Sequence, residues 1–168
     1  KRPTEPSLQI VNVNAHVTIE QSIVGSIWVI QNQVTSEPIP LHISDSILDA
    51  TNTSDEGPAC TVLSDETFSY AHAILTVQNS TILGRVKAHA IELGENTIYH
   101  DTVQVVRSQR GCLRFCYVAP ESRTPRRYNC QPDLVEQPIK AAYQANKIGK
   151  PAHDERINQV DLRVRPRF

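Results

Sequence analysis

The chain has 168 residues with 17 basic and 18 acidic side chains, and this near balance provides no uniform field for double-stranded DNA or an anionic membrane. Hydrophobic residues make up 39% of the chain, and no apolar run reaches the length of a membrane-spanning helix. No apolar segment follows Lys1, so we expect no signal peptide here. Because the sequence contains no methionine, we expect an internal fragment of a longer protein.

Residues 1–8 are rich in proline and predict an extended lead-in, whereas residues 9–118 predict mainly β strands. Most apolar side chains of the first strands are β-branched, as a pleated surface prefers. One phrase, an alternating strand followed by a small polar corner and a second apolar pair, occurs at residues 17–25, 41–49, 75–84 and 91–99. A phrase repeated at this spacing predicts stacked structural repeats.

The repeated phrase predicts which side chains face the interior. Ile19 and Ile23 are expected to point inward, with Thr18 and Glu20 in solvent. The corresponding isoleucines are placed at positions 23, 47, 82 and 98. The predicted corner residues, whose polar side chains bind the turning backbone, are Ser22, Ser46, Ser80 and Asn96.

These repeats predict an all-β fold, a single-stranded right-handed parallel β-helix, with a loop insertion at about residues 50–70. The alternative is an antiparallel sandwich, whose hairpins favour Asn-Gly or Asp-Gly turns. Neither dipeptide occurs in this chain, which favours the parallel arrangement.

Residues 119–168 predict three further elements: an arginine-rich loop, one short helix over residues 138–148 and a truncated strand over residues 160–168. Pro138 suits the first turn of that helix, and Gly149 and Pro151 are stop signals. The alternation of apolar and polar residues from Val160 onward is typical of a strand.

The arginine-rich segment 107–130 contains six arginines and one glutamate and supplies the candidate site. The candidate binding residues are Arg114, Arg123, Arg126, Arg127, Tyr117 and Tyr128. Arginine binds phosphate, sulfate or carboxylate groups with two parallel hydrogen bonds, and tyrosine stacks on sugars or bases. In the alternative interpretation, the arginines pair with acidic residues of neighbouring repeats and fix the loop to the stack.

The sequence predicts no catalytic residue, no metal site and no cofactor. Cys112, Cys116 and Cys130 have no familiar zinc spacing, which leaves a metal site, a disulfide involving Cys130 and buried free thiols as alternatives. Asp45 and Asp49 lie four residues apart but show no geometry for acid–base chemistry on a sugar.

The phrase at residues 17–25, and above all residues 111–118 and 122–133, resemble a family of large bacterial proteins from cyanobacteria, actinobacteria and myxobacteria. This family is described as right-handed β-helix or phage-tail-like, and its functional assignment is poor. The resemblance covers about residues 15–133 and the end at residues 163–168. It implies that the parent protein continues on both sides of this chain, and it carries over no catalytic residue.

From the resemblance we expect a structural segment of a phage-tail-like or contractile-injection-associated protein that contacts other protein subunits, in the bacterial cytoplasm or in an extracellular assembly. Two alternatives stay open: a carbohydrate-processing β-helix enzyme, similar to polysaccharide lyases or glycosidases, and a glycan-binding module. Glycan is therefore a second possible partner, whereas double-stranded DNA and a membrane span are not expected.

Overall fold

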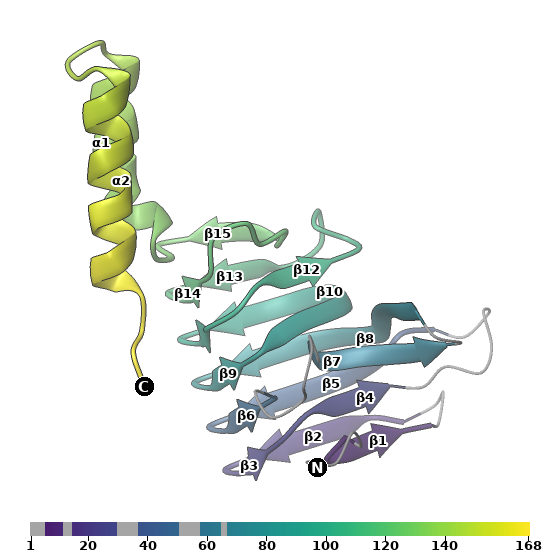
Figure 1. Cartoon of the computed structure of the whole chain (residues 1–168). Helices are drawn as coiled ribbons and strands as arrows, with labels where there is room; N and C mark the ends of the chain where they lie inside the picture. The colour runs from purple at the N-terminus through teal and green to yellow at the C-terminus, as the bar shows by residue number, and fades with distance from the viewer. Residues whose placement is uncertain (1–5, 12–14, 30–36, 51–57, 65–66) are drawn as a thin grey trace.

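The computed structural model describes residues 6–11, 15–29, 37–50, 58–64 and 67–168, which form parallel β-sheet structure followed by two C-terminal helices (Figure 1). The strands lie in three ladders, each named here by a Roman numeral. Ladder I contains β1 (Leu8–Ile10), β4 (Ile27–Val29), β7 (Pro58–Ser64), β10 (Arg85–Glu95) and β12 (Val103–Val105).

Ladder II shares the long strand β10 with ladder I, and the two form one ten-stranded sheet. Its strands in spatial order are β2 (Val17–Glu20), β5 (Ile39–Ser44), β8 (Thr67–Gln78), β10, β13 (Cys112–Arg114) and β15 (Arg126–Tyr128). Ladder III is a separate five-stranded sheet of β3 (Ile23–Val24), β6 (Ile47–Asp49), β9 (Thr81–Leu83), β11 (Ile98–Tyr99) and β14 (Tyr117–Val118).

The chain visits the ladders in a repeated order, and one run through them is called a pass here. Strands β2, β3 and β4 form one pass, and β5, β6 and β7 form the next. Every neighbouring pair within a ladder is parallel, as the sequence predicts. One antiparallel pair joins β7 to β8, with Thr61 opposite Tyr70. The predicted insertion at residues 50–70 is therefore partly strand; residues 51–57 and 65–66 lie outside the described residues.

The core lies between the ladders and consists of apolar side chains that repeat from pass to pass. In ladder II, Leu41 and Leu75 are adjacent and at most 1% exposed. In ladder III, Leu48 and Ile82 are adjacent and equally buried. Because parallel strands lie about 4.8 Å apart, equivalent side chains of successive passes stack in contact with each other.

The same corner follows ladder II in every pass. A residue with φ near +50° comes first, at Gln21, Asp45, Asn79, Asn96, Phe115 and Asn129. A small side chain follows and donates a hydrogen bond to the carbonyl oxygen two residues earlier, at Ser22, Ser46, Ser80, Thr97, Cys116 and Cys130. Asparagine tolerates the left-handed conformation better than other non-glycine residues, which explains Asn79, Asn96 and Asn129 in the first column.

Two predictions about the corner are wrong by one residue. The residue of β9 opposite Ile47 is Thr81 and not the predicted Ile82. At the predicted corner residue Asn96, the backbone has positive φ, and the next residue, Thr97, makes the hydrogen bond that the serines make in earlier passes. Ile19 is 8% exposed, as predicted, but Ile23 is 80% exposed. A turn between the two strands resets the alternation, so counting by twos from Ile19 to Ile23 gives the wrong face.

The C-terminal region contains two helices instead of the predicted single helix and strand. Helix α1 covers Asp133–Gln144, with Pro138 in its interior, and helix α2 covers Lys150–Val164. Asp133 and Glu136 in the first turn of α1 suit the positive end of the helix dipole. Pro151, predicted to end a helix, lies in the first turn of α2, where its missing N–H costs nothing. The alternation after Val160 is too short to distinguish strand from helix.

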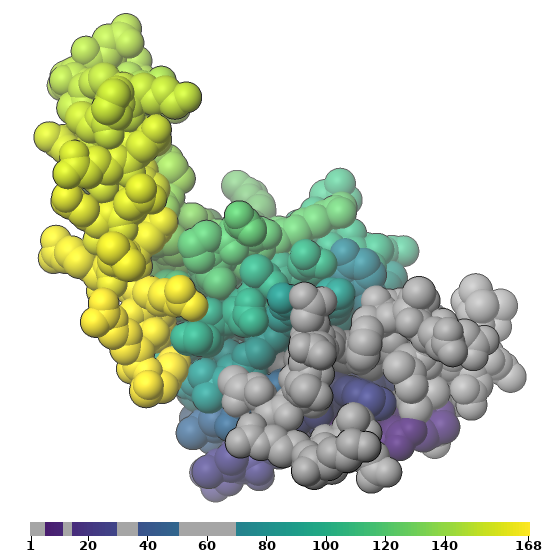
Figure 2. All heavy atoms as spheres, in the orientation of Figure 1, coloured from purple at the N-terminus to yellow at the C-terminus, as the bar shows by residue number. Residues whose placement is uncertain are grey.

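The two helices form a hairpin that rises from the ladder III side of the last strands (Figure 1). Figure 2 shows this hairpin standing clear of the strands, while the last residues of the chain return against them. Among the described residues, neither helix has the length and apolar character needed to cross a membrane.

Candidate functional site

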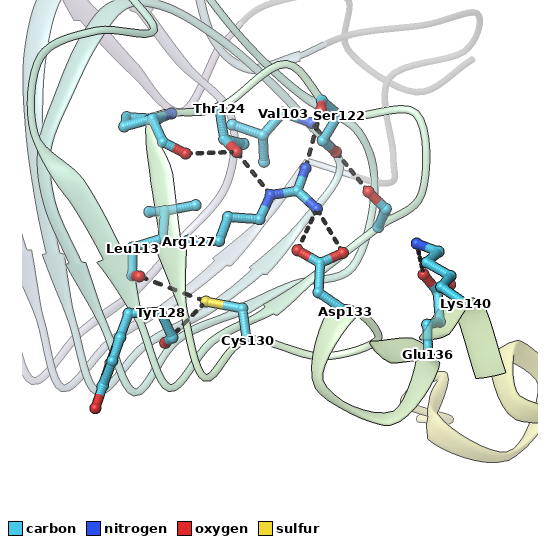
Figure 3. Close-up of polar contacts among 12 residues, drawn as sticks. Val103, Leu113, Ser122, Thr124, Arg127, Tyr128, Cys130, Asp133, Glu136 and Lys140 are labelled. Carbon is cyan, nitrogen blue, oxygen red and sulfur yellow. Dashed lines mark hydrogen bonds and ion pairs between the residues drawn. The ribbon is translucent and has the colours of Figure 1, made fainter. Parts of the chain in front are cut away.

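Arg127 closes the last pass of the stack. It lies on β15 opposite Leu113 of β13, in the inward-facing column that holds Ile43 and Val77 in earlier passes. Figure 3 shows its guanidinium among three groups, from Thr124, Ser122 and Asp133. Nε donates to Thr124 Oγ1 at 2.8 Å and Nη2 donates to the carbonyl oxygen of Ser122 at 2.9 Å. The Arg127 side chain therefore ties its own loop to the end of the core.

Asp133 completes this arrangement at the start of α1. Nη1 of Arg127 lies 3.3 Å from both carboxylate oxygens of Asp133, and the Arg127 side chain is 20% exposed. A partly buried charged pair with further hydrogen bonds to the same guanidinium holds its geometry much better than an exposed pair. Arg127 thus fixes its loop through Asp133 of α1 rather than through a neighbouring repeat, as the alternative prediction had it, and it has little capacity left for an outside anion.

Arg114, Arg126 and Tyr128 share the outer face of ladder II. Arg114 pairs with Glu95 of the previous pass at 3.4 Å, and Tyr128 lies directly opposite Arg114. Arg126 is exposed, and among the described residues no acidic group pairs with it. These three residues are the part of the predicted site that the structure brings together.

The other two predicted residues lie on different ladders. Arg123 continues ladder I, where its backbone bridges Gln104, and its side chain is exposed. Tyr117 lies on ladder III and is 8% exposed, because residues of α2 cover it. The predicted set is therefore split among three faces and the end of the core, and it forms no single binding site.

Phe115 is a feature of this region that is absent from the predicted site residues. It occupies the positive-φ corner with φ 54° and is 53% exposed. Its ring lies edge-to-face on the ring of Tyr128, with 5.9 Å between ring centroids. An aromatic residue in the left-handed conformation is strained. Its position at the corner follows from its place directly after β13, as Asn96 directly follows β10.

Cys116 and Cys130 are neighbouring members of the small-residue column and are at most 2% exposed. Both are free thiols, as is the half-buried Cys112. The interaction with Cys116 lowers the pKa of the Cys130 thiol, whereas the same interaction and burial raise the pKa of Cys116. Among the described residues, no group of three or more Cys, His, Asp or Glu side chains is placed to hold a metal ion.

A cavity of about 210 Å³ lies between ladder III and the end of α2. Its lining comes from His100, Asp101, Tyr117, Ala119, Pro120, Asp161, Leu162 and Arg165. The incorrect prediction of a strand over residues 160–168 concealed this site, because it separated Asp161 and Arg165 from Tyr117. The cavity combines an aromatic wall with two carboxylates and one guanidinium, a composition that accepts a small polar molecule.

Asp161 is the electrostatically perturbed group of this cavity. Burial raises its pKa first, and the nearby carboxylate of Glu136 raises it further. Glu136 is 7% exposed and forms an ion pair with Lys140 on the same helix (Figure 3). One oxygen of Asp161 is buried and accepts no hydrogen bond in the described part of the chain.

Comparison with protein-family models gives no match, and comparisons with curated proteins and with solved structures give no significant match.

Proposed function

We propose that this chain is a structural segment of a larger bacterial assembly, built as a single-stranded right-handed parallel β-helix, and that it acts through contacts with other protein subunits. The observation that carries this proposal is the order of the ladders. Three ladders are visited in sequence, with parallel register in each, and the result is a stiff stack with a defined end. Such stacks present long, flat surfaces to their partners.

The helical hairpin supports the same proposal. It projects from the stack (Figure 1), and Tyr143 and Leu162 on it are 39% and 66% exposed. Exposed apolar side chains on a projecting element are typical of a contact surface. The phage-tail-like resemblance of the arginine-rich segment agrees with an assembly role, and it suggests a tail or injection particle as the assembly.

Cross-linking in the parent particle tests this function. Lys147 and Lys150 are exposed on the hairpin, whereas Lys87 lies half-buried on β10 and serves as an internal comparison. With a lysine-specific reagent, we expect links from Lys147 and Lys150 to other proteins of a particle that sediments as a large species. A parent protein that sediments alone, with no links between proteins, would contradict the assembly role.

A carbohydrate-processing activity is a second candidate, supported by the cavity beside α2. Asp161 with its raised pKa, Asp101 and Tyr117 line one cavity, and acid–base catalysis on sugars uses paired carboxyl groups. Release of new reducing or unsaturated ends from acidic polysaccharides, lost in Asp161→Asn, would establish this activity. If the wild type and Asp161→Asn released new ends at the same background rate, this activity would be excluded for the polysaccharides used.

A further inference from the structure

His72 and His89 are neighbouring side chains on adjacent strands. His72 belongs to β8 and His89 to β10, and their ring centroids lie 5.3 Å apart in an edge-to-face arrangement. Both residues are half-buried. Figure 1 shows β12 on the opposite side of β10 from β8. The chain that leaves β12 therefore passes close to this histidine pair.

That chain, the loop of residues 106–111, is fixed on β10 near both of its ends. The Arg107 amide donates a hydrogen bond to the carbonyl oxygen of His89 at 2.9 Å. Gly111 has φ 84°, and a Cβ at this position would lie 1.9 Å from the carbonyl oxygen of Ile91. Only glycine permits such a close approach in this conformation. The loop therefore holds its two arginines beside β10 on a fixed backbone.

The charges that act on His89 are all positive. Burial lowers the pKa of His89 most, and the positive charges of His72, Arg107 and Arg110 lower it further. Arg110 pairs with Glu92 at 3.5 Å, but both side chains are roughly half exposed, and exposed pairs are weak. In the described part of the chain, Arg107 is exposed and forms no ion pair. The surface around His89 thus carries an excess of positive charge.

This set of side chains suits an anion better than a metal ion. Two imidazoles can bind Zn²⁺ or Cu²⁺, but two guanidinium groups beside them repel a divalent cation. Among the described residues, no group of three metal-binding side chains exists. Guanidinium groups and protonated imidazoles are N–H donors that point in several directions. The four oxygens of phosphate or sulfate can accept from donors arranged in this way.

We propose that the pair of His72 and His89, together with the loop of residues 106–111, forms a binding site for a tetrahedral oxyanion, phosphate or sulfate. Binding strengthens as pH falls, because protonation of the pair adds positive charge and N–H donors. By linkage, the bound anion favours protonation of the pair to the same extent. Neither the assembly role nor the cavity beside α2 depends on this site.

The first test follows the histidine ring signals of the full 168-residue chain by NMR between about pH 5 and pH 8. Sodium sulfate is compared with sodium chloride at equal ionic strength, and sulfate keeps its two charges over this range. If sulfate prefers the protonated site by about tenfold, saturating sulfate should raise the pKa of His89 by about one unit relative to chloride.

A second histidine pair provides an internal comparison. The rings of His16 and His42 have centroids 4.9 Å apart, but no lysine or arginine occurs between residues 3 and 84. Stacked histidines without neighbouring arginines should not select sulfate. We therefore expect the His42 signals to move equally in the two salts. A sulfate-specific response of both pairs would show that the arginine loop contributes nothing, which contradicts the proposal.

Variants separate the contributions of the arginines and the histidines. Arg107→Gln should weaken sulfate binding by about tenfold, because it removes a charged pair of donors. Arg156→Gln removes the same charge from an exposed position on α2 and should change binding by less than about twofold. His89→Gln should make sulfate binding much less dependent on pH. Circular dichroism and thermal unfolding verify that the variants are folded.

Phosphate esters and sulfated sugars are two sources of such a group. In competition with inorganic sulfate, glycerol phosphate and a sulfated glucose distinguish them, because the better-fitting ligand displaces sulfate at the lower concentration. Equal titration of His89 in sulfate and chloride, or sulfate binding that ignores Arg107→Gln, would overturn the proposal. Broadening of the His72 and His89 signals by Zn²⁺, without a response to sulfate, would overturn it in favour of a metal site.

Discussion

The middle passes and the last pass of this stack are built on different principles. In the middle passes the same contact repeats: the Asn96 amide donates to Asn79 at 3.2 Å, and the Asn79 amide donates to Asp45 at 3.2 Å. After Asn96 this column is interrupted by Phe115, and in the last pass the inward column ends at Arg127. Each middle pass is thus stabilised by contacts that recur between successive passes, whereas the last pass is stabilised by contacts that occur once.

The difference shows how a repeating structure ends. A further apolar residue at position 127 would leave an open hydrophobic surface on the last pass. Arg127 instead presents its aliphatic stem to the core and its guanidinium to Ser122, Thr124 and Asp133. The end of the stack therefore depends on one side chain, while its middle depends on many equivalent ones.

Replacing the closing arginine should have the largest effect. Arg127→Ala removes hydrogen bonds to three residues and leaves Asp133 without its cation, so we expect a loss of about 3 kcal/mol in unfolding free energy. Arg126→Ala, the neighbouring exposed arginine, should cost less than about 0.5 kcal/mol. Urea denaturation of both variants measures the contrast. Equal losses would show that Arg127 does not close the stack.

The serine column should show a smaller effect that depends on position. Ser80 donates to the carbonyl of Gln78 at 2.6 Å and accepts from the Ser46 amide at 3.2 Å. Ser80→Ala leaves that buried amide without a partner and should cost about 2 kcal/mol. Ser22→Ala removes only a donor at the exposed end of the column and should cost about 0.5 kcal/mol. Similar costs in thermal unfolding would contradict a role for the column.

Phe115→Asn converts the irregular corner into the regular one. We expect a gain of about 1 kcal/mol, because asparagine relieves the left-handed strain and extends the amide column, while the contact with Tyr128 is lost. Phe115→Leu keeps the strain and loses the ring contact, so it should destabilise the protein. A loss of stability in Phe115→Asn would show that the aromatic pair outweighs the corner.

The smallest expected effect depends on pH and belongs to the cavity. The pKa of Asp161 is raised in the folded protein, so its ionised form destabilises the fold above that pKa. Asp161→Asn should therefore have a slightly higher Tm than the wild type at pH 7. The difference should shrink as pH falls through the raised folded-state pKa and vanish below the ordinary value of 3.8. A Tm difference that is independent of pH would contradict burial of this carboxyl group.

The repeated phrase was sufficient to predict parallel stacking. Val17 pairs with Leu41 and Ile23 pairs with Ile47, as the alignment of the first two phrases requires. The later phrases were placed less well, because register shifts within β10 break the alternation between Ala88 and Leu93. A bulge of this kind depends on tertiary packing, and a pattern of apolar residues does not reveal it.

The candidate site was predicted in part. Arg114 lies on the predicted strand-like segment, whereas Arg126 and Tyr128 lie in the predicted arginine-rich loop, which contains the strand β15. The structure places the three residues on one face. The role of Arg127 depends on Asp133, and the cavity depends on Asp161 meeting Tyr117. Contacts between segments so far apart follow from the path of the chain, which the misassigned C-terminal helices concealed.

The position of Arg127 near the end of the strand region has a consequence for synthesis on the ribosome. Passes made early find a template in the pass before them, so folding can proceed from the N-terminal side as residues emerge. Until Arg127 and Asp133 have been synthesised, the newest pass exposes an apolar surface at the growing tip. A nascent chain whose Arg127 and Asp133 are still inside the ribosome would therefore carry a partly folded, adhesive tip, and one from which both residues have emerged would carry a closed tip.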